Sequence, residues 1–442
     1  MLKSFKIGGI HPKENKLSKG AKIEYFAVPE TVTIPLSQHI GAPAEAVVAK
    51  GDTVKVGQLI AKMTGFVSSN IHSSVSGTIT GVAPTANALG AMTPSITIKV
   101  EGDEWDEQID RSEALVKECS LDAKEIIKKI TDAGIVGMGG ATFPTHVKLS
   151  IPEGKTADAL IINAVECEPY LTSDHRMMLE RAEEILIGTT ILAKAINAGS
   201  IYIGIENNKK DAIAHLQKVA VAYPKIEIVA LKVKYPQGGE KQLIDAVTKR
   251  RVKSGALPID AGAVVQNVAT AVAVYEAVQK NKPLFERVVT VTGKGLSKPS
   301  NLMVRIGTPI DSLIEYCGGM GESTGKVISG GPMMGRTMSN LSSPTTKGCS
   351  GVLLIKQEEA LRDSASYCIK CGKCVEACPM GLEPYLLGRL GKLNKLADME
   401  QYEVTDCIEC GSCSYTCPAK LPLLDYIRLG KSEVMKIKRS RK

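Results

Sequence analysis

Apolar and polar residues alternate in short runs over the first part of the chain. Residues 53–60 and 75–79 are two such runs, and Val, Ile, Thr, Pro and Gly are frequent around them. An alternation with a period of two places one face of a strand on a core and the other in solvent. Residues 1–105 are therefore expected to form a small β domain.

The pattern changes after residue 105, where strand-like apolar runs alternate with helical periodicity. The expected elements are a helix at 121–133 between Ser120 as N-cap and Gly134, strands at 159–164, 201–205 and 226–232, and helices at 176–198 and 209–222. Such alternation predicts an α/β layer with a mostly parallel sheet.

A further helical stretch is expected from about residue 261, where Gln266 and Asn267 interrupt an apolar run. Buried amides are costly without partners. These two side chains therefore either cap neighbouring backbone or bind a polar ring.

The last third of the chain divides into shorter units. Alternating apolar residues after residue 286 suggest a small β-grasp-like unit, and the polar, proline-containing stretch 339–347 suggests a linker. The boundaries expected from the sequence are 1–105, 106–286, 287–340, 358–427 for a cysteine-rich helical module, and 428–442 for a basic tail. The predicted fold class is therefore multidomain, with α/β and β domains and an α-helical ferredoxin-type module.

Two cysteine runs with the spacing C-x2-C-x2-C-x3-C-P carry the clearest chemistry. Three thiolates at this spacing wrap one [4Fe-4S] cubane, and the fourth cysteine ligates the neighbouring cluster. The spacing predicts one cluster on Cys368, Cys371, Cys374 and Cys417, and a second on Cys407, Cys410, Cys413 and Cys378. Gly372 and Gly411 let the backbone approach the inorganic sulfides.

Zinc and disulfides are the alternatives for these cysteines. Structural zinc usually takes two ligand pairs separated by a longer loop, whereas here four cysteines fall within eleven residues. Disulfides are disfavoured because the N-terminus has no signal-peptide pattern and the composition is typical of a cytosolic protein. Two clusters in one module imply one-electron transfer.

Composition narrows the class of protein. With 44% hydrophobic and 23% charged residues the chain is expected to be soluble and globular, and it has no apolar run of the ~20 residues that a membrane span needs. Only 4% of the residues are aromatic, which argues against nucleic-acid binding. The net charge of +8 is concentrated in the tail, which is either frayed and solvated or a docking segment for an acidic partner or anionic lipid.

Three polar motifs follow the expected strands or helices of the α/β layer. The glycine loop 137–145 could close backbone amides around a phosphate, with Lys148 in reach to neutralise it. The segment 163–169 follows an apolar strand, and a glycine turn at 235–240 follows another. Open α/β sheets place ligands at this edge.

These motifs, in this order and together with Gln266 and Asn267, resemble the NADH-binding flavoprotein subunit of respiratory complex I. The unit that follows resembles that family's soluble-ligand-binding β-grasp domain. Residues 48–77 resemble a biotinyl/lipoyl-type barrel-sandwich domain, although the turn 65–70 contains no lysine for a swinging arm. With the opening 5–12 and the two cysteine runs, the whole chain resembles the C subunit of the Rnf ion-translocating ferredoxin:NAD oxidoreductase complex.

The resemblance implies a non-covalent FMN in the α/β domain. It assigns the phosphate side to Gly137, Gly139, Gly140 and Lys148, the ribityl chain and ring to Asn163, Glu166, Gly238, Glu240 and Asn267, and the nicotinamide side to Phe143 and Glu168. Three positions depart from the complex I relatives: Met138 replaces an Arg, Val165 an Asp and Gly239 a Glu.

The function implied is that of a peripheral NAD(H)-reacting subunit on the cytoplasmic face of the cell inner membrane. Its partners would be NADH/NAD+ and the membrane and ferredoxin-like subunits of the same complex, and it would bind no nucleic acid and have no membrane span of its own. FMN would connect the two-electron chemistry of NADH to the one-electron clusters. The alternatives are a soluble NADH-dependent flavin and iron-sulfur cobalamin reductase, and a non-catalytic electron-relay subunit.

Overall fold

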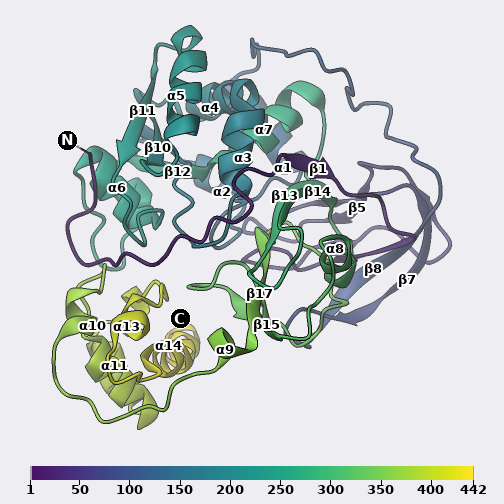
Figure 1. Ribbon diagram of the computed structural model, residues 1–442. Coiled ribbons are helices and arrows are strands. Elements are labelled where there is room, and N and C mark those ends of the chain that lie inside the picture. Colours follow the sequence, from purple (N-terminus) through teal and green to yellow (C-terminus); the bar gives the residue numbers. More distant parts are fainter. Residues whose placement is uncertain (1, 442) are drawn as a thin grey trace.

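A four-stranded parallel sheet with the order β11-β10-β9-β12 carries the α/β domain of the computed structural model, which describes residues 2–441 (Figure 1). Its strands are β9 (Ala159–Asn163), β10 (Ser200–Glu206), β11 (Ile226–Leu231) and β12 (Ala263–Asn267). Leu160 and Ile162 join the core formed with α4 and α7, whereas Ile161 joins a second core with α6. Both faces are thus covered, as a parallel sheet requires, and the predicted α/β layer is confirmed.

The helices around this sheet differ from the predicted ones at the start of α1 and at Arg181. They are α1 (Ala123–Asp132), α2 (Thr145–Leu149), α3 (Ser173–Glu180), α4 (Ala182–Ile196), α5 (Lys210–Val219), α6 (Glu240–Thr248) and α7 (Val268–Lys280), with 3-10 turns η1 (Ala220–Ala222) and η2 (Pro258–Ala261). Asp122, not Ser120, caps α1 in a capping box with Glu125. The helix expected at 176–198 is broken at Arg181.

The stretch containing Gln266 and Asn267 is a strand, so the prediction of a helix there was wrong. β-Branched Val264 and Val265 pair with β9, and the helix starts only after Asn267. The Asn267 side chain accepts a hydrogen bond from the amide of Ala269 at 2.9 Å. One of the two alternatives, capping of neighbouring backbone, therefore holds for Asn267.

A six-stranded sheet, β1-β14-β13-β17-β15-β16, lies beside the α/β domain. Its elements are β1 (Ile23–Tyr25), β13 (Glu286–Thr292), β14 (Ser300–Arg305), α8 (Ile310–Tyr316), β15 (Thr324–Ser329), β16 (Arg336–Thr337), β17 (Gly351–Lys356) and the adjoining α9 (Gln357–Ala360). Because β17 pairs with β13 and β15, this unit extends beyond residue 340, where its end was expected.

The expected linker at 339–347 is packed instead of free. Ser343, Thr345 and Lys347 are buried. The Lys347 ammonium donates to the carbonyls of Asn70 and Gly134, both at 2.7 Å. A buried lysine needs such partners, and this one ties the β domain and the α/β domain to the six-stranded sheet.

The predicted N-terminal β domain is present, and its sheets are formed from Thr31 onward. Its strands are β2 (Thr31–Pro35), β3 (Glu45–Ala46), β4 (Thr53–Val54), β5 (Leu59–Lys62), β6 (Ile71–His72), β7 (Gly77–Ala86) and β8 (Met92–Val100), in sheets β2-β8-β7-β4 and β3-β5-β6. The preceding residues 3–25, here called the N-terminal strap, run along the other domains (Figure 1). Lys3 forms a β-bridge with Leu231, Ile10 forms one with Tyr235, and β1 pairs with β14.

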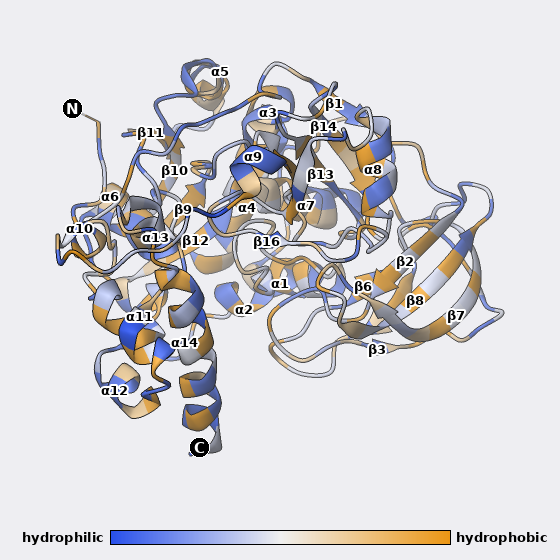
Figure 2. Ribbon diagram, turned by 60° about the horizontal axis from the view of Figure 1, so that its bottom comes forward, coloured by the Kyte–Doolittle hydropathy of each residue, from blue (hydrophilic) through white to orange (hydrophobic). Residues whose placement is uncertain are grey.

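The cysteine-rich module is helical, as expected. Its elements are α10 (Lys373–Glu376), α11 (Pro384–Lys392), α12 (Leu396–Gln401), η3 (Val404–Asp406), α13 (Ser412–Thr416) and α14 (Leu423–Ser440). The basic residues from Arg428 to Arg439 do not form a frayed tail, because they lie in α14, which buries Val434 and alternates hydrophobic with hydrophilic residues (Figure 2). The last residue of the predicted tail, Lys442, lies outside the described residues. No helix within residues 2–441 is long and apolar enough to span a membrane.

Replacing Gly188 with alanine tests the packing of α4 on α7 under the sheet. A Cβ there would lie 1.9 Å from the carbonyl oxygen of Ala271. We expect Gly188→Ala to destabilise the fold by about 1–3 kcal/mol, despite the better helix propensity of alanine. Thermal unfolding should show a lower midpoint than for Gly65→Ala, whose Cβ meets nothing within 4 Å; equal midpoints would contradict this packing.

Candidate functional site

The carboxyl edge of the parallel sheet carries two asparagines side by side. Asn163 ends β9 and Asn267 ends β12, and the two are register partners. The Asn163 amide donates to the carbonyl of Gly238 at 2.9 Å, and the Asn267 amide donates to Asp174 at 2.8 Å. Three predicted site residues thus meet at the edge where open α/β sheets bind ligands.

The glycine loop lies over the end of β12. A Cβ on Gly139 would lie 3.0 Å from the Asn267 amide nitrogen, so only glycine allows this approach without a shift. Gly140 is exposed, has a φ of 65°, and has open space where a Cβ would be. The loop is closed by a 2.8 Å hydrogen bond from the Gly137 amide to the Phe143 carbonyl.

Lys148 and Glu240 also meet at this edge. The Lys148 ammonium lies 2.6 Å from the Glu240 carboxylate and donates to the carbonyl of Val265 at 3.1 Å. Their side chains are 29% and 37% exposed, so the pair is open to a ligand. Glu240 reaches this place as the first residue of α6, after Gly239 as its N-cap.

The residues at this edge fit a polar, phosphate-bearing ring compound such as FMN. The glycine loop leaves a cradle that side chains would fill. The buried amide nitrogens of Gln237 and Gln266, next to Gly238 and Asn267, have no hydrogen-bond partner within residues 2–441. Buried donors normally have partners, so the polar packing at this edge is incomplete within the described residues.

The three departures from the complex I pattern occupy defined places. The Met138 amide donates to Thr270 at 2.9 Å, and its carbonyl accepts from the buried Arg287 at 3.2 Å. Val165 is fully buried and its carbonyl accepts from Lys209 at 2.7 Å. A Cβ at Gly239 would lie 2.4 Å from the Gln242 side-chain oxygen, so a larger residue there needs that side chain to move.

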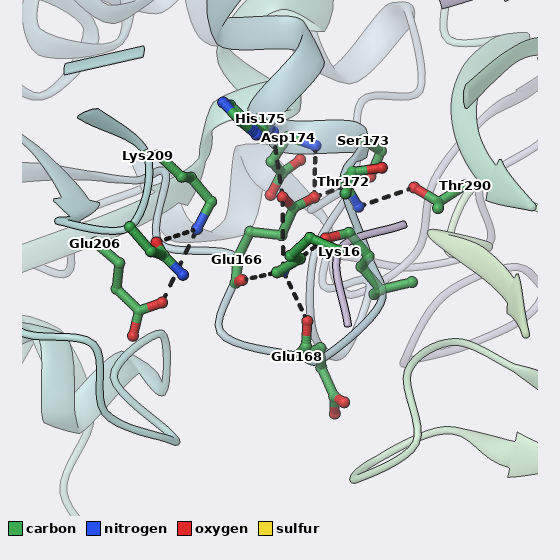
Figure 3. A network of polar contacts seen from close by, with 12 residues as sticks. Lys16, Glu166, Glu168, Thr172, Ser173, Asp174, His175, Glu206, Lys209 and Thr290 are labelled. Carbon is green, nitrogen blue, oxygen red and sulfur yellow. Dashed lines mark hydrogen bonds and ion pairs between the residues drawn. The ribbon is translucent and has the colours of Figure 1, made fainter. Parts of the chain in front are cut away.

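Glu166 is engaged by the start of α3. Its carboxylate accepts hydrogen bonds from the amides of Asp174 at 2.7 Å and His175 at 3.3 Å (Figure 3). This is favourable because the N-terminus of a helix presents unpaired amides and positive charge. The contact of Glu166 with ribityl or ring stays a prediction.

Glu168 is engaged by the loop 330–335 of the six-stranded sheet. Its carboxylate accepts from the amides of Met334 at 2.8 Å and Met333 at 3.1 Å. Burial raises the pKa of Glu168 to about 7, while the two amides and the ammonium of Lys16 oppose the rise. The carboxyl group thus titrates near neutrality, at the side where the nicotinamide was expected.

Sequence reasoning missed the buried charges beside this loop. Asp174, at the start of α3, has its pKa raised to about 7 by burial and by the charge of Glu166. Its partners include Asn267 by hydrogen bond and Arg287 by charge. The only indication of these charges in the sequence was a charged run after the segment 163–169. Such a run is also typical of an exposed helix start.

Cys378 of the first cysteine run lies beside cysteines of the second run. One apolar cavity is lined by these four cysteines together with residues such as Leu424 and Ile427; they are Cys378, Cys407, Cys410 and Cys413. Burial, with a smaller contribution from the neighbouring thiols, raises the pKa of the Cys413 thiol to about 12. Amides of Leu382 and Glu409 lie 3.4 Å from the sulfurs of Cys378 and Cys407, as donors that tune a cluster do.

The remaining cysteines form the other set. Cys374 and Cys417 pack in the same apolar cluster. Burial raises the pKa of the Cys374 thiol, and the neighbouring Cys417 thiol adds to the rise. Cys368 and Cys371 are exposed. The cavity lining agrees with the set that includes Cys378. No contact joins Cys368 and Cys371 to Cys374 and Cys417 within residues 2–441, so the assignment of ligands stays a prediction.

The set with Cys378 lies directly against the α/β domain. The Tyr235 hydroxyl donates to the Cys410 carbonyl at 2.9 Å, and the Gly9 amide donates to the Ala377 carbonyl at 3.0 Å. Cys167 contacts both regions. It packs with Tyr235 and Cys410, and its sulfur would lie 3.3 Å from a Cβ placed on Gly238. The cavity of Cys378, Cys407, Cys410 and Cys413 and the carboxyl edge of the parallel sheet are therefore neighbours.

Comparison with known families agrees with this division. Four family models match: the RnfC barrel sandwich hybrid domain at residues 3–103, the Nuo51 FMN-binding domain at 130–276, the SLBB domain at 288–337 and the 4Fe-4S dicluster domain at 360–418. The predicted fold class and the predicted cofactor classes, FMN and [4Fe-4S] clusters, are thereby confirmed.

Several curated proteins match over nearly the whole chain. The C subunit of the proton-translocating ferredoxin:NAD(+) oxidoreductase complex of Clostridium ljungdahlii is 48% identical over 98% of this chain and 94% of the relative. The C subunit of the Na(+)-translocating ferredoxin:NAD(+) oxidoreductase complex of Acetobacterium woodii is 45% identical over 97% of this chain and 96% of the relative.

Among solved structures, an NAD+-reducing [NiFe]-hydrogenase chain in the H2-reduced state is similar in fold. It matches with a TM-score of 0.51 and 20% identity, over 71% of this chain and 63% of that chain. The likeness supports the fold over the matched part of the chain.

Double cysteine variants test the crossed arrangement. If Cys378 and Cys407 ligate one cluster, Cys378→Ser combined with Cys407→Ser should lose that cluster alone, leaving about four of about eight irons per chain. Cys378→Ser combined with Cys368→Ser should lose both clusters. Iron analysis with EPR of the reduced protein checks this, and the opposite pattern would establish uncrossed ligation.

The pKa of Glu168 predicts a pH-dependent stability. Because its pKa is raised to about 7, the folded protein holds a proton there that the unfolded chain releases. That stability is present below about pH 4 and is lost as pH rises through 7. The unfolding midpoint of Glu168→Gln minus that of the wild type should therefore rise between pH 5 and pH 8; a constant difference would show that Glu168 is already ionised at pH 5.

Proposed function

This chain belongs to the family of C subunits of ion-translocating ferredoxin:NAD+ oxidoreductase complexes, and from that premise we propose that it is the peripheral NAD(H)-reacting subunit of such a complex. It passes electrons between NAD, FMN and two [4Fe-4S] clusters. The observation that carries this proposal is the cavity of Cys378, Cys407, Cys410 and Cys413 packed beside the carboxyl edge of the parallel sheet.

When bound, FMN exchanges a hydride with NAD and single electrons with iron-sulfur clusters. The amides of Gly139 and Gly140 and the ammonium of Lys148 would hold the FMN phosphate. The Gly137 amide is not free for this role, because it donates to the Phe143 carbonyl and closes the loop. Because Lys148 is paired with Glu240, the phosphate would compete with that carboxylate. The amides of Asn163 and Asn267 would orient the polar parts of the flavin.

Glu168 and Phe143 form the nicotinamide side. The amides of Met333 and Met334 fix the Glu168 carboxyl group and keep it from rotating into solvent. With a pKa of about 7, this group can accept a hydrogen bond or donate one to a carboxamide near neutral pH. The site thus orients nicotinamide with groups that the fold has already positioned.

The partner subunits dock at the exposed cysteines. Tyr367 is 94% exposed and Ile369 is 68% exposed beside Cys368 and Cys371, and Lys370 is next to them. An apolar patch with positive charge suits an acidic ferredoxin-like subunit. We place the chain on the cytoplasmic face of the cell inner membrane, held by the membrane subunits of the complex.

An anaerobic titration tests this function. The cluster-reconstituted protein should contain about eight irons and one releasable FMN per chain, and NADH should bleach the flavin and then the clusters. Eight irons with no flavin and no response to NADH would support an electron-relay subunit instead. Full reduction by NADH together with rapid reduction of a corrinoid would favour the soluble cobalamin reductase.

Removing the Lys148 charge tests the phosphate site. Lys148→Met should weaken FMN binding on the order of tenfold, because the bound phosphate loses a cationic partner. Iron content should not change. FMN release measured by fluorescence gives the affinity, and Lys155→Met, which removes a lysine paired with Asp260 elsewhere, is the control. Equal FMN affinity in both variants would place the phosphate away from Lys148.

A further inference from the structure

Lys16 of the N-terminal strap reaches into the loop that carries Glu166 and Glu168 (Figure 3). Its ammonium donates to the carbonyls of Glu166 at 2.9 Å, Glu168 at 2.9 Å and Leu171 at 2.6 Å. The Lys16 side chain is only 10% exposed. An ammonium has three protons to donate, and here each has a backbone acceptor.

The loop 164–172 needs this support because it lacks regular secondary structure. Residues 164–172 contain no helix or strand, and Glu166 and Tyr170 have φ values of 47° and 68°, which non-glycine residues adopt at a cost. Three carbonyls that point at one place would repel one another and stay unpaired without a cation. Lys16 supplies that cation.

Two further contacts of the strap act on the same loop. The Tyr170 amide donates to the carbonyl of Glu14 at 2.8 Å, and the hydroxyls of Ser18 and Thr172 lie 2.6 Å apart. The strap therefore follows the loop along its length. Lys16 is the charged member of this set, and its ammonium is also 4.0 Å from the Glu166 carboxylate.

We propose that Lys16 is a positioning residue for the NAD(H) reaction: it holds the loop 164–172 so that Glu168 stays at the nicotinamide side. This inference rests on the proposed function for its effect on NADH, but the positioning itself does not. Lys16 acts through Glu168 and touches neither flavin nor nicotinamide in this role.

The test compares Lys16→Met, which keeps the aliphatic stem and removes the ammonium, with Lys13→Met. Lys13 lies on the same strap and is exposed. Hydrogen exchange of the peptide covering 164–172 should speed up on the order of tenfold in Lys16→Met, because the loop loses its shared donor. The peptide covering 137–145 should exchange as in the wild type, which shows that the rest of the site is folded.

Steady-state kinetics give the second readout on the same FMN-loaded and cluster-loaded proteins. In Lys16→Met the KM for NADH should rise on the order of tenfold with a smaller change in kcat, while FMN and iron contents equal those of Lys13→Met. If Lys16→Met does not fold, Lys16→Gln, which keeps one donor group, serves the same comparison.

Unchanged exchange of 164–172 would overturn the inference, as would faster exchange with an unchanged KM for NADH. A wild type that does not react with NADH would instead overturn the proposed function, and the exchange measurement would then still decide whether Lys16 positions the loop.

Discussion

The contact between the turn at Cys378 and the N-terminal strap is the constraint on which the two redox sites depend. Gly8 has a φ of 67°, and a Cβ there would lie 2.4 Å from the carbonyl carbon and oxygen of Cys378. The backbone of the strap thus touches the backbone of a predicted cluster ligand, and Gly9 adds a hydrogen bond to Ala377. Only glycine permits so close an approach.

This contact gives the strap a double role. Around Gly8 and Gly9 it contacts the turn at Cys378, beside the cavity of Cys378, Cys407, Cys410 and Cys413, and further along Lys16 contacts the loop of Glu168. Two neighbouring parts of the strap therefore contact the predicted cluster side and the predicted nicotinamide side of the site. The buried charges nearby are paired with backbone groups or with one another, which limits the cost of burying them.

The sequence predicted the parts of this structure that depend on local patterns. The iron-sulfur module and the parallel strands were predicted correctly, because cysteine spacing and strand burial leave a direct pattern in the sequence. The roles of the polar residues at the strand ends stay predictions. The strap could not be predicted in the same way, since Lys16 and Gly8 act through residues about 150 and 370 positions away. The strand at Gln266 was missed because pairing with β9 overrides the helical appearance of the segment.

The most direct measurement of the account is stopped-flow reduction by NADH of the Gly8→Ala variant, with Gly20→Ala as control. The added methyl group at residue 8 displaces the Cys378 turn, whereas a Cβ at Gly20 meets nothing within 4 Å. With iron and FMN contents unchanged, the account predicts that flavin bleaching keeps the wild-type rate and cluster bleaching becomes slower. Cluster bleaching at the wild-type rate would contradict it.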